Sequence, residues 1–249
     1  MIDFFWDEQF QLGEESTLLT QLTWPNYLVE PSDIPEPSLE FSISEAELLR
    51  RMPTWGIRRK GDGTLIANAS AVLISADVKS DALPAAGWRF AMEAFGKNEK
   101  PNCLCLLAAN IHPAYRRQGL AALLLKKGKE IASSRGLDYM IGPVRPTAKS
   151  EFPELSMTEY LIKKNEAGET YDPWLRLHLR LGAELLNICE QSVIIQASAE
   201  KWREWTKQKL TSSGKYTLPQ GLAPLDLDIS KNLGIYKEPN VWVRYTLRR

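Results

Sequence analysis

Residues 112–121 combine positive charge and glycine just ahead of an apolar run. The sequence here is HPAYRRQGLA, so Arg116 and Arg117 stand just before Gly119, and apolar residues then recur at helical spacing through about residue 134. The first N–H groups of a helix have no partner within the helix, and together with the helix dipole they attract anions. A glycine at such a junction lets a phosphate approach the backbone closely. We therefore predict a phosphate-binding loop, although the spacing is not that of a P-loop.

A second group of residues could act on a carbonyl group. His178 lies four residues after Trp174 and four before Gly182, so on a helix these three share one face. A histidine with a near-neutral pKa can move a proton or donate a hydrogen bond to a developing oxyanion; the alternative is a packed, silent histidine. Upstream, Thr147 offers a hydroxyl and Arg145 a cation for an acyl or carboxylate group. The alternatives are a turn hydroxyl and a surface arginine.

Composition narrows the classes of partner. Lys plus Arg and Asp plus Glu both number 31 in 249 residues, so no overall field favours nucleic acid or an anionic membrane. The apolar runs are too short for a membrane span, and the acidic N-terminal stretch is unlike a signal peptide. Three cysteines make no disulfide framework, and with two histidines they show no zinc spacing, so no metal is expected. Cys103 and Cys105 are predicted core thiols, and the setting is a reducing cytoplasm.

Alternating strands and helices must position both groups. A proline-rich extended arm is expected over 29–40, and a capping box at Ser44 precedes a short helix that ends near Pro53. A polar, loop-rich stretch over 148–171 separates the two halves of the chain and is either a lid or a plain surface insert. Strands are expected as a hairpin over 55–74 and at 103–111, 138–144, 188–197 and 241–247. Helices are expected at 120–134, 173–182 and 201–210. This alternation predicts a mixed α/β sheet in one domain.

The segment IHPAYRRQGLAALLL resembles the acyl-CoA loop of the GCN5-related N-acetyltransferase (GNAT) superfamily, whose signature is Arg/Gln-x-x-Gly-x-Gly/Ala. Arg116, Gly119 and Ala121 fall on its three defined positions. The resemblance implies an α/β (α+β) fold in which helices flank a mixed, mostly antiparallel sheet that is splayed at the acyl-CoA site. It covers residues 43–197, so the single domain over 1–249 would comprise an N-terminal arm (1–42), this core and a C-terminal extension (198–249).

The resemblance also implies site residues and a donor. The donor would be acetyl-CoA or malonyl-CoA, with no metal, and amides near Asn110 and Ile111 would polarise its carbonyl. The implied cofactor-binding residues are Asn110, Ile111, Arg116, Arg117, Gln118, Gly119, Leu120 and Ala121. Many members carry Tyr-x-x-x-Gly-Phe with the tyrosine as general acid, and here His178 takes that place. Trp55 would border the acyl pocket, with a core role as the alternative, and Trp174 would face the substrate.

A narrower likeness leaves the reaction open. The segments VRPT and DPWLRLHLRLGA resemble the GNAT branch that includes the GNAT-like loading domains of polyketide synthases. That branch implies that Thr147 and His178 hold a thioester carbonyl while CO2 leaves, before transfer to a carrier-protein thiol. We predict acyl transfer to a small-molecule acceptor, foremost an amine. Decarboxylation with loading of a carrier protein, and a non-catalytic acyl-CoA-binding domain, remain alternatives.

Overall fold

The structure is a computed structural model that describes residues 3–7, 10–34, 45–97 and 99–247. Nine strands of these residues form one sheet. They are β1 (Phe4–Asp7), β2 (Thr54–Arg59), β3 (Leu65–Ile74), β4 (Cys103–Ile111), β5 (Tyr139–Val144), β6 (Ala183–Ala197), β7 (Gly214–Tyr216), β8 (Leu225–Asp228) and β9 (Leu233–Thr246). The helices are α1 (Glu14–Thr23), α2 (Glu45–Arg51), α3 (Gly87–Gly96), α4 (Leu120–Ser134), α5 (Met157–Leu161), α6 (Pro173–Arg180) and α7 (Ala199–Thr206), with short 3-10 turns η1 (Asn26–Leu28), η2 (Pro113–Tyr115) and η3 (Lys149–Glu151).

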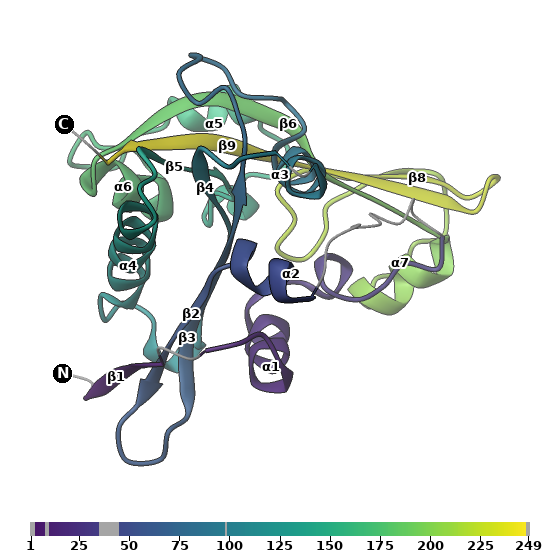
Figure 1. Cartoon of the computed structure of the whole chain (residues 1–249). Helices are drawn as coiled ribbons and strands as arrows, with labels where there is room; N and C mark the ends of the chain where they lie inside the picture. Colours follow the sequence, from purple (N-terminus) through teal and green to yellow (C-terminus); the bar gives the residue numbers. More distant parts are fainter. Residues whose placement is uncertain (1–2, 8–9, 35–44, 98, 248–249) are drawn as a thin grey trace.

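The sheet has two arms that meet at β4 and β5. The strand order is β1-β2-β3-β4-β5-β9-β8-β7, and β6 pairs with the other edge of β9. Pairing is antiparallel throughout except between β4 and β5, which run parallel. In Figure 1 β2, β3 and β4 descend together, whereas β6 and β9 cross the top of the molecule. The mixed, mostly antiparallel sheet expected from the sequence is therefore confirmed.

Helices cover both faces of this sheet. One hydrophobic cluster, which includes Trp55, Leu124 and Leu175, packs under α4 and α6, and these helices lie together on the left of Figure 1. A second cluster packs under α3 and contains the three cysteines, all buried and free. The core position predicted for Cys103 and Cys105 is confirmed, and burial raises the pKa of the Cys103 thiol to about 12.

Most predicted elements are present, and the chain after residue 198 enters the sheet. β9 pairs with β5, β6 and β8, so residues 233–246 form a central strand of the second arm.

Trp202 and Trp205 of α7 pack edge to face in a third hydrophobic cluster. The expected arm over 29–40 can be followed to residue 34; the rest of it, and the predicted cap at Ser44, lie outside the described residues. Within the described part of the chain, every helix is too short or too polar to cross a membrane.

Candidate active site

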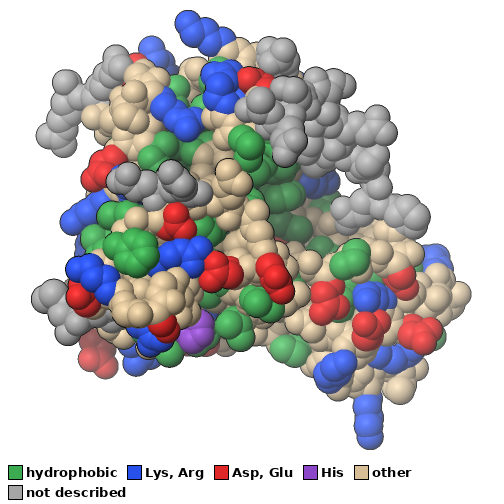
Figure 2. Space-filling view, turned by 60° about the horizontal axis from the view of Figure 1, so that its bottom comes forward, with side chains coloured by type: hydrophobic (Ala, Val, Ile, Leu, Met, Phe, Trp, Pro, Cys, Tyr) green, Lys and Arg blue, Asp and Glu red, His purple; other side chains and the backbone are tan. Residues whose placement is uncertain are grey.

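β4 and β5 separate part-way along their length. Their pairing covers Cys103–Cys105 and Tyr139–Ile141, after which β5 continues along β9 and β4 continues along β3. The register of β3 against β4 shifts between Ser70 and Ala71, which leaves Leu107 as an extra residue, a bulge that bends the strand. Figure 2 views the lower end of the molecule, where hydrophobic side chains gather in a hollow. The sheet is thus split where the sequence resemblance expects it.

Backbone N–H groups of β4 face this split. The His112 N–H donates to the Ile66 carbonyl, and Asn110 is paired with Asn68, so both lie in hydrogen-bonded pairs of the antiparallel ladder. Because such pairs alternate along a strand, the N–H groups of Ala109 and Ile111 point away from β3, toward the side that β5 has left. The Ile111 N–H group is therefore not used by β3, and its role toward a thioester carbonyl stays a prediction. The Asn110 N–H points toward β3 in the pair with Asn68, so the expectation that this N–H binds the ligand is corrected.

The Asn110 side chain has a different role, which sequence reasoning missed. It is 4% exposed, and its Oδ1 accepts from Thr23 Oγ1 at 3.1 Å and Trp24 Nε1 at 2.5 Å. Its Nδ2 donates to Asn68 Oδ1 at 2.9 Å and to Thr20 Oγ1 at 3.1 Å. The amide thereby ties α1 to the two strands beside the split. No local signal marks this role, since its partners lie up to 90 positions away in the chain.

The predicted phosphate-binding loop follows β4 directly. Gly119 has φ of 82° and is the N-cap of α4, where no side chain caps the helix. An added Cβ at Gly119 would meet no atom within 4 Å, so the space beside this residue is open. The N–H groups of the first turn, at Leu120 and Ala121, have no acceptor within the helix. The Arg116 and Arg117 side chains are exposed on the same loop, and Arg116 Nε lies 3.4 Å from the Ile111 carbonyl. The loop joins the split strand to the uncapped N-terminus of α4.

A contact that the sequence did not predict supports the loop. Arg59 of β2 donates from Nη1 to the Tyr115 hydroxyl at 2.8 Å, while its other nitrogens hold Asp62 in the hairpin. Gln118 Nε2 lies 3.5 Å from the Ala114 carbonyl, so the Gln118 side chain folds back onto the loop. These contacts hold the loop with its N–H groups outward.

Trp55 is a core residue, so the expectation that it binds substrate is corrected. Its side chain is 3% exposed, and Nε1 donates to the Leu124 carbonyl of α4 at 3.0 Å. A Cβ at Gly128 would come within 3.1 Å of the Trp55 ring, so helix and indole are in direct contact. The ring thus holds α4 against the sheet.

His178 lies wholly inside the protein. It is 0% exposed, its Nδ1 is 2.7 Å from the Tyr245 hydroxyl, and its Nε2 is buried without a hydrogen-bond partner among the described residues. The Trp174 ring stands edge to face against it, with ring centroids 4.4 Å apart, which confirms that these residues share a helix face. Burial lowers the pKa of His178 to about 3, so the expected near-neutral pKa is wrong. The imidazole is neutral at pH 7 and is a poor proton acceptor.

This burial makes the protein less stable in mild acid. The unfolded chain protonates His178 near pH 6.5, whereas the folded chain resists protonation until about pH 3. Within that window the unfolded state binds more protons, so the free energy of unfolding falls by about 1.4 kcal/mol for each pH unit below 6.5. We expect acidification from pH 7.5 to 5 to cost the wild type about 2 kcal/mol more than a His178→Gln variant. Urea unfolding at both pH values measures this difference, and equal losses in the two proteins would contradict the burial argument.

Arg145 is held by the protein itself. Its Nε donates to Glu238 Oε1 at 3.0 Å, and another guanidinium nitrogen bonds the Gln220 carbonyl. Glu238 is 1% exposed and also accepts from the Tyr236 hydroxyl at 2.8 Å. Because a buried carboxylate already neutralises it, the predicted role of Arg145 as a cation for substrate is corrected. Thr147 is exposed just beyond the end of β5, and no contact joins it to His178 among the described residues.

The acidic side chains near the site all have hydrogen-bond partners. Asp172 is 1% exposed and caps α6, accepting from the N–H groups of Trp174 and Leu175 as predicted, and it also accepts from the Tyr160 hydroxyl at 2.9 Å. The other three bond to hydroxyl groups: Glu151 to Tyr171, Glu154 to Thr217 and Glu159 to Ser156. None of them is an unengaged base within the described residues.

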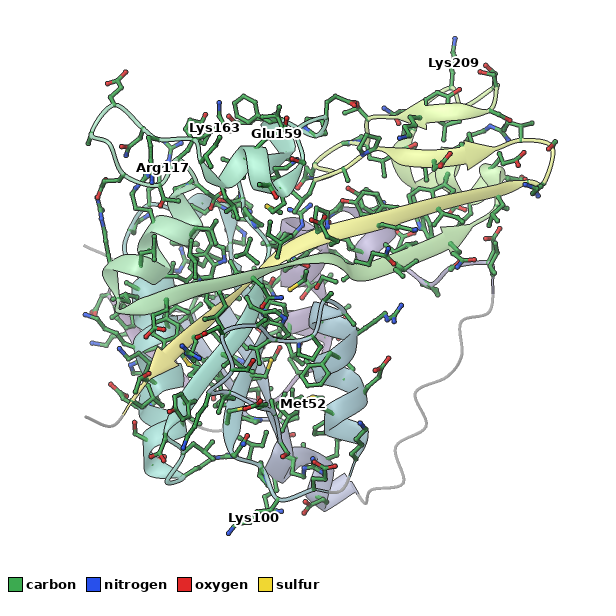
Figure 3. All side chains as sticks on the ribbon, turned by 90° about the horizontal axis from the view of Figure 1, so that it is seen from above. Met52, Lys100, Arg117, Glu159, Lys163 and Lys209 are labelled. Carbon is green, nitrogen blue, oxygen red and sulfur yellow. The ribbon has the colours of Figure 1, made fainter. Side chains whose placement is uncertain are left out.

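The insert over 148–171 is built into the fold. It contains η3 and α5, and its Met157 and Tyr160 are buried in the main core cluster. Seen from above in Figure 3, Glu159 and Lys163 of the insert lie on the same side of the molecule as Arg117, opposite Lys100. The prediction of a loop-rich segment therefore missed a helix and two core residues.

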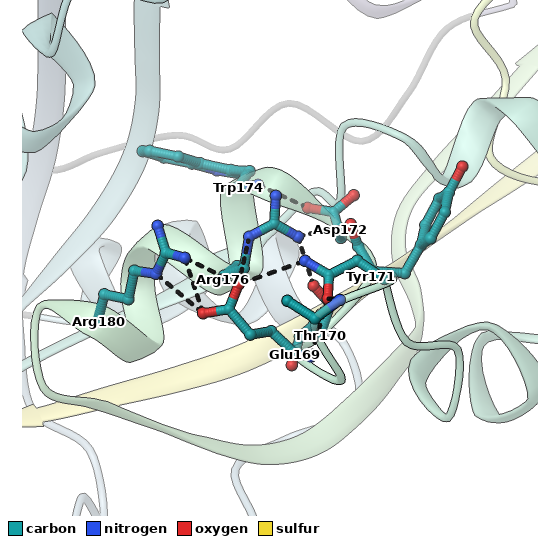
Figure 4. Close-up of polar contacts among 9 residues, drawn as sticks. Glu169, Thr170, Tyr171, Asp172, Trp174, Arg176 and Arg180 are labelled. Atoms are coloured by element: carbon teal, nitrogen blue, oxygen red, sulfur yellow. Dashed lines mark hydrogen bonds and ion pairs between the residues drawn. The ribbon is translucent and has the colours of Figure 1, made fainter.

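Arg176 and Arg180 are engaged away from His178. Both approach the carboxylate of Glu169, with Arg180 at 2.7 Å and Arg176 at 3.6 Å (Figure 4). Arg176 also donates from Nη1 to the carbonyls of Thr170 and Tyr171. The spacing of these arginines, four apart on the helix, is compatible with solvated or carboxylate-paired side chains, and the structure shows the second.

A sheet split between two parallel strands, with an uncapped helix N-terminus at the end of one of them, defines an acetyltransferase fold of the GNAT type. Residues 19–149 match the acetyltransferase (GNAT) family, and the chain belongs to that family. It is 32% identical over 185 residues to a protein named arginine N-acetyltransferase avaD from Aspergillus versicolor. The match covers 65% of this chain and 64% of that protein, which is less than two thirds of its length.

Two solved structures share the whole fold. The loading GNATL domain of CurA from Lyngbya majuscula superposes with a TM-score of 0.56 at 17% identity, over 98% of each chain. The GNAT-like decarboxylase GphF, solved in complex with isobutyryl-CoA, gives a TM-score of 0.52 at 22% identity, over 96% of this chain and 98% of that one. Because both identities are low, these two superpositions show a shared fold and nothing more.

Proposed function

We propose that this protein transfers an acyl group from a coenzyme A thioester to an amine. The observation that carries the proposal is the split between β4 and β5, which leads directly to the uncapped N-terminus of α4. A coenzyme A thioester has a pyrophosphate at one end and an acyl group at the other, joined by a long flexible arm. The helix N-terminus suits the pyrophosphate, and the split between the strands suits the flexible arm and the acyl group.

The residues of the loop fit the pyrophosphate. The N–H groups at Gly119, Leu120 and Ala121 begin a helix that no side chain caps, and the exposed guanidinium groups of Arg116 and Arg117 supply positive charge. Gln118 completes the loop, and the free N–H group of Ile111 suits the thioester carbonyl. The donor we propose is acetyl-CoA or another short acyl-CoA, with malonyl-CoA as the alternative.

His178 serves the reaction as a hydrogen-bond donor rather than as a proton carrier. Its pKa of about 3 keeps the ring neutral, and its Nε2 is buried without a partner. When the amine nitrogen attacks the thioester carbon, negative charge develops on the oxygen and then leaves with the sulfur as the C–S bond breaks. A neutral N–H aimed at that oxygen stabilises the charge, and the ammonium proton passes to solvent. Trp174, which packs on the ring, would border the acyl group.

An amine acceptor is supported by the relative at 32% identity, whose name is arginine N-acetyltransferase. Arginine is therefore the first acceptor to test, followed by other free amines. We also propose that residues 1–249 form one domain and that the protein works in the cytoplasm. The cytoplasmic setting is supported by the three cysteines, which are all buried free thiols.

The Arg116 side chain should contribute to donor binding through a single charge-assisted contact. We expect Arg116→Ala to weaken coenzyme A binding by about 1–2 kcal/mol, which corresponds to roughly a five- to thirtyfold rise in Kd. Titration calorimetry measures the change. Arg89→Ala on α3 removes another exposed positive charge and should leave Kd unchanged. Equal affinities for Arg116→Ala and wild type would argue against a pyrophosphate at this loop.

One observation favours a second function, decarboxylation of malonyl-CoA with transfer of the acetyl product to a carrier-protein thiol. Glu151, Glu154, Glu159 and Asp172 each accept a hydrogen bond from another group of the protein, so none of these four is reserved for an incoming ammonium group. Loss of CO2 from a malonyl thioester needs no base, because the enolate needs only hydrogen-bond donors at its oxygen. A neutral His178 would supply one donor, and Thr147, exposed just beyond β5, is the second donor that the resemblance implies.

Mass spectrometry separates the two reactions. The purified chain is incubated with acetyl-CoA and arginine or other amines, and in parallel with malonyl-CoA alone. The proposal expects an acetylated amine and free coenzyme A in the first mixture, and unchanged malonyl-CoA in the second. Conversion of malonyl-CoA to acetyl-CoA and CO2, without acetylation of any amine, would put decarboxylation in its place. No product in either mixture, with coenzyme A still bound, would mark a non-catalytic binding domain.

A further inference from the structure

The Tyr245 hydroxyl contacts the candidate catalytic histidine from behind. Tyr245 lies on β9, is 0% exposed, and its oxygen is 2.7 Å from Nδ1 of His178. Among the described residues this is the hydroxyl's one hydrogen bond. The opposite nitrogen of the ring, Nε2, is buried and has no partner there. One ring nitrogen, Nδ1, is therefore bonded within the fold, whereas Nε2 has no hydrogen-bond partner among the described residues.

The direction of this hydrogen bond follows from the chemistry of the two groups. A phenol is the stronger acid and a neutral imidazole nitrogen the stronger acceptor, so the hydroxyl donates to Nδ1 and Nε2 carries the ring hydrogen. The reverse arrangement would leave two buried groups unsatisfied, the hydroxyl hydrogen and the Nε2 lone pair. The chosen arrangement leaves one polar hydrogen, at Nε2. A buried donor without an acceptor is costly until a ligand supplies an oxygen.

The ring has little freedom to turn out of this arrangement. Trp174 packs edge to face on His178, and the Tyr245 ring lies with its centroid 5.8 Å from the imidazole. On the far side of the tyrosine, Lys129 of α4 has its Nζ 5.3 Å from the Tyr245 ring centroid and donates to the Leu181 carbonyl at 3.1 Å. Burial keeps the imidazole neutral, and the packed rings hold its orientation.

The geometry points to Tyr245 as a positioning residue: its hydroxyl holds the hydrogen of His178 on Nε2, where it can be donated to the thioester oxygen. This role rests on the proposed function, because it concerns the same carbonyl site. It does not depend on whether the acceptor is an amine or the donor loses CO2, since both reactions place negative charge on that oxygen. Tyr245 therefore acts through His178 rather than on the substrate.

Tyr245→Phe tests this role, because it removes the hydroxyl and keeps the ring. We expect kcat to fall about tenfold with the KM for acyl-CoA unchanged, as for loss of one hydrogen bond used at the reacting oxygen. The matched control is Tyr27→Phe, which removes a buried hydroxyl that donates to the Pro219 carbonyl at 3.0 Å. That control should lose stability but keep kcat.

Nitrogen-15 NMR of histidine-labelled protein gives a readout that needs no turnover. The chain has two histidines, so few ring signals need assignment. We expect His178 in the wild type to carry its hydrogen on Nε2, and Tyr245→Phe to give a mixture of the two tautomers. A wild-type hydrogen on Nδ1, or an unchanged tautomer and kcat in Tyr245→Phe, would overturn the inference. A wild type that turns over no acyl-CoA would instead contradict the proposed function, and the tautomer would still decide the role of Tyr245.

Discussion

Gly119→Glu is expected to abolish coenzyme A binding while the protein stays folded. Glutamate at this position places a carboxylate in the space in front of the first N–H groups of α4, where the pyrophosphate must lie. The first side-chain atom meets no protein atom, because a Cβ at Gly119 has nothing within 4 Å of it. It therefore acts on the ligand through bulk and charge repulsion. Titration calorimetry should show at least a hundredfold weaker binding, which corresponds to about 3 kcal/mol.

The backbone of Gly119 requires a matched control, because its φ of 82° is costly for any residue with a side chain. Gly168 in the insert has φ of 75° and is equally open, with nothing within 4 Å of an added Cβ. Gly168→Glu therefore carries a similar strain and the same charge, in the insert rather than in the loop. We expect both variants to lose similar stability, and the Gly168 variant to bind coenzyme A normally. Normal binding by Gly119→Glu would contradict the assignment of the loop.

His178→Ala is expected to reduce turnover by roughly a hundredfold or more, the usual effect of removing one oxyanion donor. Coenzyme A affinity should change little, because the ring lies on α6 and the pyrophosphate site that we propose lies at the start of α4. The measurement is a set of acyl-CoA turnover rates at a temperature well below the melting point of every variant. Melting temperatures are recorded alongside, since removing a fully buried ring also costs stability.

His178→Gln separates the donor role from packing. The glutamine amide nitrogen can reach the region of Nε2, so this variant keeps a donor without an imidazole. We expect its turnover to lie between that of the wild type and that of His178→Ala. If His178→Ala matched the wild type in rate and differed only in melting temperature, the histidine would be a core residue and nothing more.

The parts of the site that the sequence predicts are those set by neighbours along the chain. The order of arginines and glycine at 116–119 marks the loop, since a helix start and a positive φ both depend on a few adjacent residues. The same holds for Asp172, whose place before a proline predicts the cap on α6. Counting from Gly182 was enough to place Trp174 and His178 on one helix face.

The parts that could not be predicted depend on residues that are distant in sequence. His178 owes its partner and part of its burial to a tyrosine 67 positions later, so its lowered pKa has no local signal. Arg145 is paired with a glutamate 93 positions away, and before that pair is known it looks like a free cation. The local sequence around Trp55 fits both a tryptophan that lines a pocket and one that packs beneath a helix. Tertiary packing decided each of these cases.

The position of β9 in the sheet has a consequence for how the protein folds. β5 ends at Val144, and its antiparallel partner β9 ends at Thr246, so this pairing closes a loop of about 100 residues. At a synthesis rate of about 5–20 residues per second, the partner edges of β5 and β6 remain unmatched on the ribosome for several seconds. Such edges can pair with other chains, and non-local pairing of this kind is slow. Expression at lower temperature or with chaperones should therefore raise the yield of native protein more than it would for a sheet closed by hairpins.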